Sequence, residues 1–454
     1  MDNKNIEWRK KKLKQLREEI ESGQLNALRE LVPNQMIDDL CEASGYRFRK
    51  RLLSPLITIL HMVSAALSRE GSFQSAWENL GQTGRSGVLA EARGRIPYSV
   101  WQSLEKWIIK QIHQEDNGNP KWRGHRMIGV DGTGVSMSDE EELTQHFGHR
   151  NVGSHVRGSG EGHFPLARVV TAFNLQTLIH IGHEVGNHKA SERVLFCTLL
   201  PRLEKTDVVV FDRLYAGANL YALYKRSGIE FIGGIHPCLK VERLKVIHVL
   251  DDGDQWVEMK LMKKHRKKDP ALPESIVIRL IETRIRGEGK EKRIWIATSL
   301  LDAQQYPARE ICLWHKRRWK IETLLKEAKI LLGANVLRSK SVEGIYKELC
   351  ARLIALNLLH WLILKSSHSK HQAPDRTSVT TTLRLVNAYS LKMSTAPIWQ
   401  LPLLYCQMLE DIACAQVMYR PNRSEPRMIK RDEWKYPRLQ TSRRKWRDQH
   451  YLAA

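Results

Sequence analysis

The sequence predicts an α/β protein whose helical ends flank a strand-rich centre. Apolar residues recur at helical spacing near both ends, continuous apolar runs of strand length occupy the centre, and short strands separated by turns follow them. These three patterns predict the fold class. With 454 residues, the chain is too long for one simple core and is expected to form several domains.

The first 120 residues are predicted to be mostly helical. Segment 53–80 has apolar residues at helical spacing, and Gly71 is expected to break the helix. The basic side chains just before this segment are candidates for a binding surface, and a solvated helix face is an equally good interpretation. They are Arg47, Arg49, Lys50 and Arg51.

The centre of the chain, residues 121–237, changes to an α/β pattern. Strands are predicted over 126–137 and 166–175, and a helix over 191–203. Residues 207–234 follow as strand, turn, helix and strand. The sequence therefore predicts a sheet covered by helices in this region.

The next segments differ again. Residues 238–300 hold short strands separated by turns, one of them over 263–274, and predict a small all-β unit. Residues 301–367 return to helical spacing, and their apolar stretch 350–364 is expected in a core or dimer contact. The remaining residues, 368–454, are predicted to form a helical and basic tail.

Composition indicates a polyanionic partner. Lysine and arginine number 73 against 50 aspartate and glutamate residues, a formal net charge of +23. Such a surplus is typical of proteins that bind DNA or RNA, and a membrane surface is the weaker alternative. No apolar run reaches about 18 residues, and no secretory signal is evident, so no membrane segment is expected. Seven scattered cysteines without a CxxC pair fit a reducing, cytoplasmic compartment.

Three carboxylates are candidates for catalysis. Asp212 ends the apolar strand VVVFD, and Asp131 lies on a predicted strand before small residues that would let a ligand approach. An aspartate at the end of an apolar strand is costly to bury without a partner, although each of them alone also suits a turn or a helix N-cap. Glu322 is the third candidate, in the basic segment 314–329.

Segment 314–329 predicts an amphipathic helix with a polar border. At about 100° per residue, His315, Arg318, Glu322 and Lys329 fall within a stripe of about 60°. An apolar face lies beside it, formed by Trp314, Ile321, Leu325 and Ala328. A solvated helix with Glu322 paired to Arg318 is the alternative interpretation.

Clustering of the three carboxylates would favour a divalent metal site. Carboxylates held close together repel each other and raise their pKa values, and divalent cations remove that penalty. Ligands that are all oxygen atoms suit Mg²⁺ or Mn²⁺. Two such ions can activate a water molecule or a 3′-hydroxyl and stabilise the departing oxygen of a phosphodiester. The basic residues beside Glu322 would then hold DNA phosphates.

These residues resemble the DDE transposases of bacterial insertion sequences. The blocks DGTGVSMSD, FDRLYAGANLYALYKRSGIEF and RRWKIE carry the three acids in the order of that family. The spacing of His315, Arg318, Glu322 and Lys329 is that of the insertion-sequence-four signature Y-x2-R-x3-E-x6-K, with histidine in place of the usual tyrosine. The resemblance covers roughly residues 25 to 365.

The resemblance implies an RNase H-like catalytic core interrupted by an all-β insertion. Residues 1–120 would be the helical DNA-binding domain, and 238–300 the insertion. The two parts of the catalytic core would be 121–237 and 301–367, and the C-terminal helical and basic region would be 368–454.

The resemblance also implies cut-and-paste transposition with two Mg²⁺ or Mn²⁺ ions held by Asp131, Asp212 and Glu322. Its partners would be double-stranded DNA, at the inverted-repeat ends of the element and at the target, and a second copy of the chain. A hairpin intermediate is an option. Further DNA contacts would come from His315, Arg318 and Lys329, from Arg213, and from Trp295 stacking on a flipped base.

Two other functions fit the same sequence. A transposase-like protein that binds DNA without cleaving it would need the basic surface and not the acids. A metal-dependent nuclease would need both and would not require particular DNA ends. Cleavage assays on DNA with and without the element ends distinguish the three functions.

Overall fold

The computed structural model describes residues 31–49, 53–68, 74, 87–116, 121–151, 161–236, 238–287 and 290–418. Gly71, Lys50, Arg51 and the C-terminal basic tail lie outside these residues. The chain divides into two compact units, and each is described by itself. Unit 1 comprises Met1–Gln114, Gly134–Ala167 and Glu327–Ala454, and unit 2 comprises Glu115–Thr133 and Arg168–Lys326.

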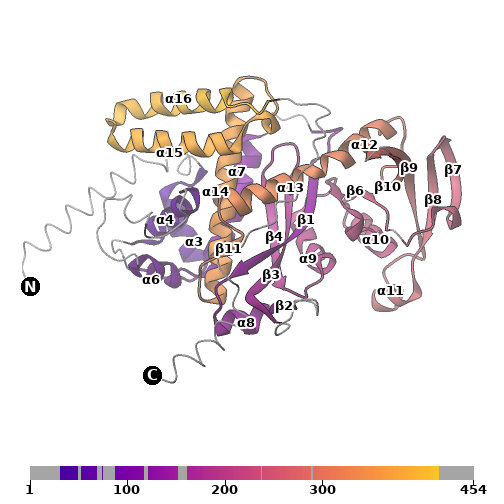
Figure 1. Cartoon of the computed structure of the whole chain (residues 1–454), viewed down its shortest axis with the longest axis horizontal. Helices are drawn as coiled ribbons and strands as arrows, with labels where there is room; N and C mark the ends of the chain where they lie inside the picture. Colours follow the sequence, from indigo (N-terminus) through magenta and orange to yellow (C-terminus); the bar gives the residue numbers. More distant parts are fainter. Residues whose placement is uncertain are drawn as a thin grey trace, which may run out of the picture. The chain divides into compact units, whose positions relative to one another are not determined.

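Unit 1 is built on the long helix α14, Val342–Ser369. Ser341 caps it by accepting a hydrogen bond from the Gly344 N–H at 3.2 Å. Helix α14 contacts α4, α15 and α16, and Figure 1 shows α15 and α16 side by side in yellow-orange. The other helices of unit 1 with their bounds are α3 (Asn34–Ala43), α4 (Pro55–Leu67), α6 (Gly87–Arg95), α7 (Tyr98–Glu115), α8 (Glu141–Phe147), α15 (Val379–Thr395) and α16 (Leu401–Cys414).

Helix α14 is mostly apolar, and nearly all of its residues are buried. Its length and its mean hydropathy of 1.4 over 18 residues would suffice to cross a membrane, yet 94% of that window is buried within the protein. A helix that is hydrophobic all round must be covered on all sides. The predicted burial of 350–364 in a core is confirmed.

A buried charge network lies at the start of α14. Glu348 accepts hydrogen bonds from Arg352 Nη2 at 2.8 Å and from the Ser339 N–H at 2.9 Å and Oγ at 2.5 Å. Arg352 also donates to the Leu332 carbonyl. Burial alone would raise the pKa of Glu348, but the Arg352 charge and the Ser339 hydrogen bonds outweigh it and lower that pKa. The network therefore stabilises the ionised carboxylate.

The strands of the described residues form one sheet, most of which lies in unit 2. Its order through unit 2 is β4-β3-β1-β5-β6-β10-β9-β8-β7. Strands β1, β5 and β6 run parallel to one another. The neighbours further along this order, from β6 and β10 through β10 and β9 and then β9 and β8 to β8 and β7, pair antiparallel. The strands are β1 (Met127–Met137), β3 (Glu161–Asn174), β4 (His180–Asn187), β5 (Val208–Phe211), β6 (Glu230–Gly234), β7 (Lys245–Asp251), β8 (Asp254–Lys260), β9 (Ser275–Gly287) and β10 (Lys290–Thr298).

Two short strands complete the sheet in unit 1. There, β11 (Val336–Leu337) runs parallel to the end of β1, and β2 (His149–Asn151) is antiparallel to the start of β3. The helices of unit 2 are α9 (Glu192–Leu199), α10 (Ala218–Arg226), α11 (Lys263–Lys268), α12 (Ala308–Arg317) and α13 (Trp319–Lys326). The predicted α/β class is confirmed as a mixed fold with a large sheet and helices.

The core of unit 2 explains why β5 reads as a continuous apolar run. Its four residues, Val208 to Phe211, are fully buried, as expected for a parallel strand covered on both faces. Phe231 of β6 stacks on Tyr221 of α10 with ring centroids 4.3 Å apart. The chain emerges from this packed core at Asp212.

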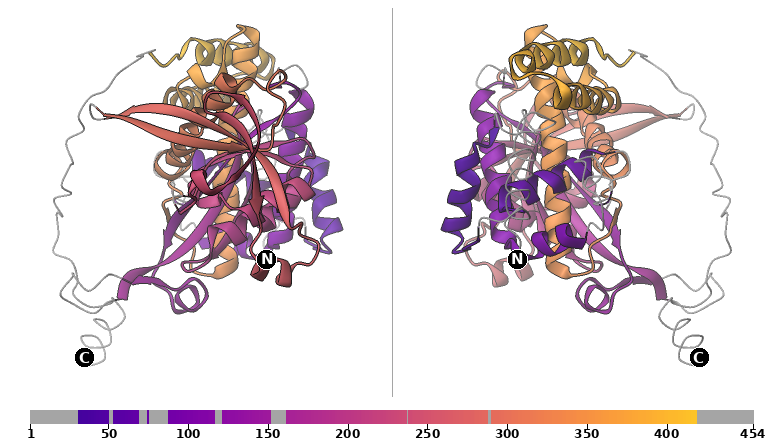
Figure 2. Two further views of the ribbon diagram at one scale, coloured as in Figure 1. Left: turned by 90° about the vertical axis from the view of Figure 1, so that its right-hand side faces the viewer. Right: turned by 90° about the vertical axis from the view of Figure 1, so that its left-hand side faces the viewer.

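The predicted all-β region contains the expected four strands, but it also contains a helix. Strands β7 to β10 form a meander, and β10 pairs with β6, so the meander extends the same sheet. Figure 2 (left) shows these strands fanned out, which is the twist usual in β-sheets. The segment predicted as a turn at 263–274 begins with α11. Lysine and arginine are good helix formers, and the turn pattern underestimated them.

Candidate functional site

Asp131 on β1 and Asp212 directly after β5 lie beside each other, because β1 and β5 are neighbouring parallel strands. The register pairs Gly129 of β1 with Val210 of β5. Two residues further along each strand the chain reaches Asp131 and Asp212, and neighbouring strands are about 4.8 Å apart. The strand pairing therefore puts the two carboxylates at the same level of the sheet.

A backbone N–H orients each aspartate. Asp131 Oδ1 accepts from the Gly132 N–H at 2.8 Å, and Asp212 Oδ1 accepts from the Leu214 N–H at 2.7 Å. No other hydrogen bond from the described residues reaches either carboxylate. Each aspartate thus has its second oxygen available to a ligand, and oxygen ligands of this kind suit Mg²⁺ and Mn²⁺.

The electrostatics around Asp131 favour an added cation. Burial raises the pKa of Asp131 to about 6, and the negative charges of Asp212 and Glu192 act in the same direction. The Gly132 N–H and the Arg318 charge act against them. Carboxylates that repel each other in this way match the donor set of a divalent metal site.

Glu322 lies on α13, which packs directly against β1. The contact is so close that a methyl group at Gly129 would come within 2.5 Å of Ile321 Cδ1. Glu322 follows Ile321 and has a side chain that is 50% exposed. Its carboxylate is 3.9 Å from the guanidinium of Arg318, whose charge also acts on Asp131. Arg318 therefore links Glu322 to Asp131 electrostatically.

The Gly129→Ala variant is expected to disturb this helix–strand contact. The added methyl would collide with Ile321 and with Leu175, at 2.7 Å, and overpacking typically costs about 1–3 kcal/mol. The free energy of unfolding in urea measures this cost, and Ile321→Val should recover part of it. Gly87→Ala is the control, because nothing lies within 4 Å of the position of its Cβ. Equal stability of both glycine variants would contradict the contact.

The predicted single helix over 314–329 is wrong in two places. Helix α12 ends at Arg317 and α13 begins at Trp319, with Arg318 between them. Residues Glu327–Leu331 form a π-helix, η4. A π-helix has more residues per turn than the α-helical wheel assumes, so the wheel misplaces Lys329. Lys329 lies in unit 1, and burial lowers its pKa.

His315, at the position of the family's tyrosine, is a neutral side chain. Burial and the nearby Arg318 charge lower the pKa of His315 to about 4. At neutral pH its imidazole can donate one hydrogen bond but carries no charge. On this helix, positive charge for a phosphate must therefore come from arginine and lysine side chains.

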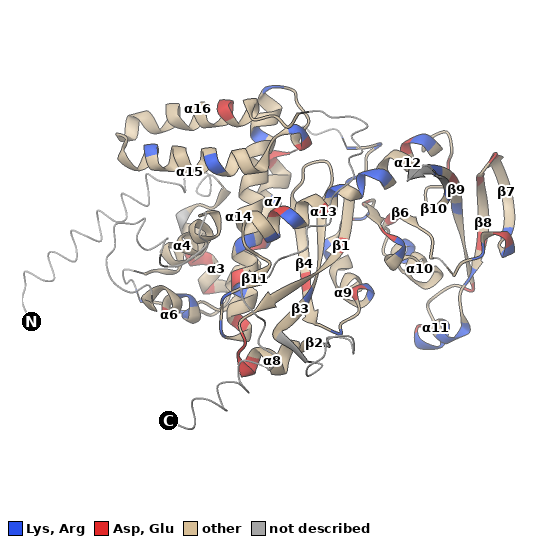
Figure 3. Cartoon of the chain, in the orientation of Figure 1, with Lys and Arg blue, Asp and Glu red and all other residues tan. Residues whose placement is uncertain are grey.

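The other two predicted DNA contacts occupy different environments. Arg213 follows Asp212 directly and is exposed. Trp295 lies on β10 opposite Glu282, is partly buried, and packs against the hydrophobic core of unit 2. Figure 3 shows the basic residues of α11, α12 and α13 in blue. Among the basic residues just before segment 53–80, Arg47 and Arg49 are exposed, as a contact with the ends of the DNA element would require.

Three residues around the aspartates were not predicted from the sequence: Glu192, Arg168 and Tyr215. Glu192 accepts hydrogen bonds from Arg168 Nη1 at 2.6 Å and from Tyr215 Oη at 3.2 Å. Burial and the surrounding carboxylates raise the pKa of Tyr215, so its hydroxyl stays protonated and donates. Gly132 makes room for the Glu192 carboxylate, where the sequence suggested room for a ligand. Of these three residues, only Tyr215 lies in a block quoted for the family resemblance, FDRLY, three residues after Asp212.

Comparisons with known proteins match this chain to transposases. A family model described as Transposase DDE domain matches residues 122–358. The chain is 25% identical over 334 residues to "Transposase InsG for insertion sequence element IS4" of Escherichia coli (strain K12), covering 72% of each chain. It is 22% identical over 352 residues to "Probable transposase for insertion sequence element IS5377" of Geobacillus stearothermophilus, covering 74% of this chain and 84% of that protein.

A third relative is matched over a shorter segment. "Putative transposase InsZ" of Escherichia coli (strain K12) is 23% identical over 158 residues, covering 33% of this chain and 51% of that protein. Fold and site together define a mixed α/β protein that gathers acidic side chains at adjacent strands. The chain belongs to the family of transposases with a DDE domain, since that family's model matches more than half of it. Membership implies DNA as the partner and a divalent metal ion as the cofactor.

Proposed function

We propose that this chain is a cut-and-paste DNA transposase with an RNase H-like catalytic core. One observation carries the proposal: within a DDE domain, the register of β1 and β5 sets Asp131 beside Asp212, and Arg318, whose charge acts on Asp131, is paired with Glu322 at 3.9 Å. The reaction would nick DNA at the ends of the element, with a hairpin as an option, and join the freed end to target DNA. Two copies of the chain would pair the two ends.

The fold supports this assignment of the core. Strands β3, β1, β5 and β6 are neighbours in the sheet, and α9, α10, α12 and α13 accompany them along the chain. The meander β7–β10 enters the chain between Asp212 and Glu322, where the family resemblance places the β insertion. We assign the proposed insertion to this meander together with α11.

The acidic residues are proposed to hold two Mg²⁺ or Mn²⁺ ions. Asp131 and Asp212 would each offer the oxygen that accepts no hydrogen bond from the described residues, and Glu322 would add its half-exposed carboxylate. Bound cations would supply the Lewis acidity that activates a water molecule or 3′-hydroxyl and stabilises the departing oxygen. The Gly132 and Leu214 N–H groups keep the two aspartates oriented for this task.

The basic residues near Glu322 are proposed to position the DNA backbone. Arg318 would contact a phosphate while its charge acts on Asp131, and exposed Arg213 and Lys329 would bind others. Neutral His315 would donate a hydrogen bond in place of the family's phenol. Trp295 is retained as a candidate for base stacking through the part of its ring that is not buried.

A cleavage assay with the full chain tests the proposed function. The substrates are DNA that carries the terminal inverted repeats flanking the gene and the same DNA with scrambled ends, with Mg²⁺, with Mn²⁺ or with EDTA. Metal-dependent nicking at the intact ends is the expected result. Nicking of both DNAs would instead indicate a nuclease, and end binding without nicking would indicate a DNA-binding relative that lacks catalysis.

Helix α11 is expected to add DNA-backbone contacts from the insertion. No salt bridge joins its four exposed lysines to the described residues. Each phosphate contact contributes about 0.9 to the slope of log K against log salt concentration. Replacing all four with glutamine should therefore reduce that slope by up to about 3.6. The four are Lys263, Lys264, Lys267 and Lys268.

The matched control for α11 removes the same charge elsewhere in unit 2. Four exposed lysines on other elements are suitable for replacement by glutamine: Lys205, Lys225, Lys240 and Lys260. Fluorescence anisotropy over a series of salt concentrations measures both slopes. If the two variants show the same slope, α11 makes no special contact with DNA.

A further inference from the structure

Glu192 touches the segments that carry both aspartates. It stands in the first turn of α9 with a side chain that is 13% exposed. Its carboxylate accepts a hydrogen bond from the Tyr215 hydroxyl at 3.2 Å, and Tyr215 lies three residues after Asp212. The same carboxylate forms an ion pair with Arg168 of β3 at 2.6 Å. The same carboxylate lies against Gly132, where any added Cβ would collide with it.

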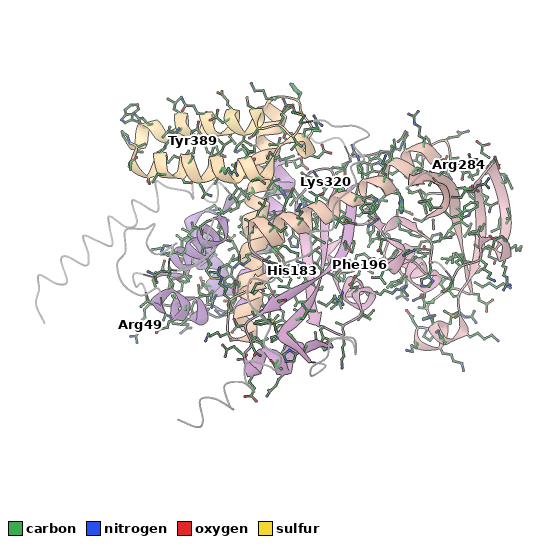
Figure 4. All side chains as sticks on the ribbon, viewed as in Figure 1. Arg49, His183, Phe196, Arg284, Lys320 and Tyr389 are labelled. Carbon is green, nitrogen blue, oxygen red and sulfur yellow. The ribbon has the colours of Figure 1, made fainter. Side chains whose placement is uncertain are left out.

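Two further residues of α9, Arg193 and Phe196, also contact the loop that follows Asp212. Arg193 Nε donates to the Leu214 carbonyl at 2.5 Å, and the N–H of Leu214 is the group that orients Asp212. Phe196, one turn along α9 and labelled in Figure 4, packs edge-on against Tyr215 with ring centroids 5.7 Å apart. The loop of Asp212 is thus fixed through Tyr215 and Leu214 by the beginning of α9.

We propose that Glu192 is a positioning residue for the metal-binding aspartates. Through Tyr215 and Gly132 it sets the distance between the Asp212 loop and the Asp131 segment, and its charge adds to the attraction for a divalent cation. Arg168 holds the Glu192 carboxylate in place by its ion pair. This inference rests on the proposed function, because it concerns the same metal site.

Glu192→Gln tests the role with little change in shape. The amide oxygen can still accept from Tyr215, but the negative charge beside Asp131 and the ion pair with Arg168 are lost. Removing such supporting groups typically weakens metal binding about 10- to 100-fold. We expect that decrease in Mn²⁺ affinity, measured on the full chain by electron paramagnetic resonance, and an equal rise in the Mg²⁺ concentration for half-maximal cleavage. The affinity for the DNA ends should not change.

Two further variants make the result specific. Glu184→Gln is the matched control, because Glu184 of β4 is also paired with an arginine, Arg202, at 3.5 Å. It should bind Mn²⁺ as the wild type does. Tyr215→Phe removes the hydrogen bond from the other side and should weaken Mn²⁺ binding in the same direction, so it carries the test if Glu192→Gln does not fold.

The outcomes separate the inference from the proposed function. If the wild type binds Mn²⁺ and Glu192→Gln and Tyr215→Phe bind it equally well, the positioning role is overturned while the transposase proposal stands. If the wild type binds no Mn²⁺ and cleaves no DNA, the proposed function fails and the positioning role fails with it.

Discussion

Asp131→Asn, Asp212→Asn and Glu322→Gln are each expected to reduce DNA strand cleavage by about 10³-fold or more while end binding persists. A metal ion contributes several kcal/mol of charge stabilisation in a transition state, and about 4 kcal/mol corresponds to 10³-fold in rate. Each substitution keeps the shape of the side chain and removes a negative oxygen that we propose as a metal ligand. The basic side chains that we propose to bind DNA remain intact.

Cleavage rates and end-binding affinities are measured together for these variants. Gel analysis of single-turnover nicking at saturating Mg²⁺ gives the rate, and anisotropy gives the affinity. Glu258→Gln is the control, since this glutamate of β8 is paired with Lys245 at 3.5 Å outside the proposed site. Wild-type cleavage by Glu322→Gln would remove that glutamate from the site, and the same result for both aspartate variants would refute the site as a whole.

Glu348→Gln is expected to lower the free energy of unfolding by about 3–5 kcal/mol. This carboxylate is the buried partner of Arg352, and breaking such a pair leaves one charge buried without compensation. Urea denaturation of the full chain, followed by tryptophan fluorescence, measures the loss. Replacing Glu348 and Arg352 together with apolar residues of similar volume should recover much of the stability.

A surface pair provides the comparison for Glu348→Gln. Asp269→Asn breaks an ion pair with Arg226 of 2.8 Å on exposed side chains and should cost at most about 1 kcal/mol. Equal effects of Glu348→Gln and Asp269→Asn would contradict the importance assigned to the buried network.

The stability effect of Glu348 should also depend on pH. The native-state pKa of Glu348 is lowered, so its contribution is present above the unfolded-state pKa and disappears as the pH falls through the native-state pKa. The glutamine variant has no such group. The difference in unfolding free energy between wild type and variant should therefore narrow on acidification.

Much of the site could be predicted from local pattern. The run VVVFD identifies a buried strand with an acid at its end, and the structure has β5 fully buried before Asp212. Helical spacing likewise placed Glu322 next to an apolar face, and Ile321 and Leu325 of α13 are buried. In each case the spacing of the hydrophobic residues is set by packing against a core, so the element and its buried face can be predicted from that spacing.

The remaining features depend on tertiary contacts that have no local pattern. Glu192 resembles any acidic residue that favours the N-terminal turn of a helix, and only folding brings it to Gly132 and Tyr215. The π-helix Glu327–Leu331 cannot be recognised from a wheel that assumes a constant turn per residue. The segment of α11 contains a helix former at every position before Asp269 apart from His265, yet its neighbouring prolines predicted a turn.

The enclosure of α14 has a consequence during protein synthesis. Helices α15 and α16, which contact α14, follow it in the chain. The ribosome therefore completes this apolar helix before two of the helices that cover it have been synthesised. Until they arrive, a surface suited to lipid or to aggregation faces water. During that stage the nascent protein exposes apolar surface of the kind that chaperones bind, and truncation near residue 370 would leave that surface exposed permanently.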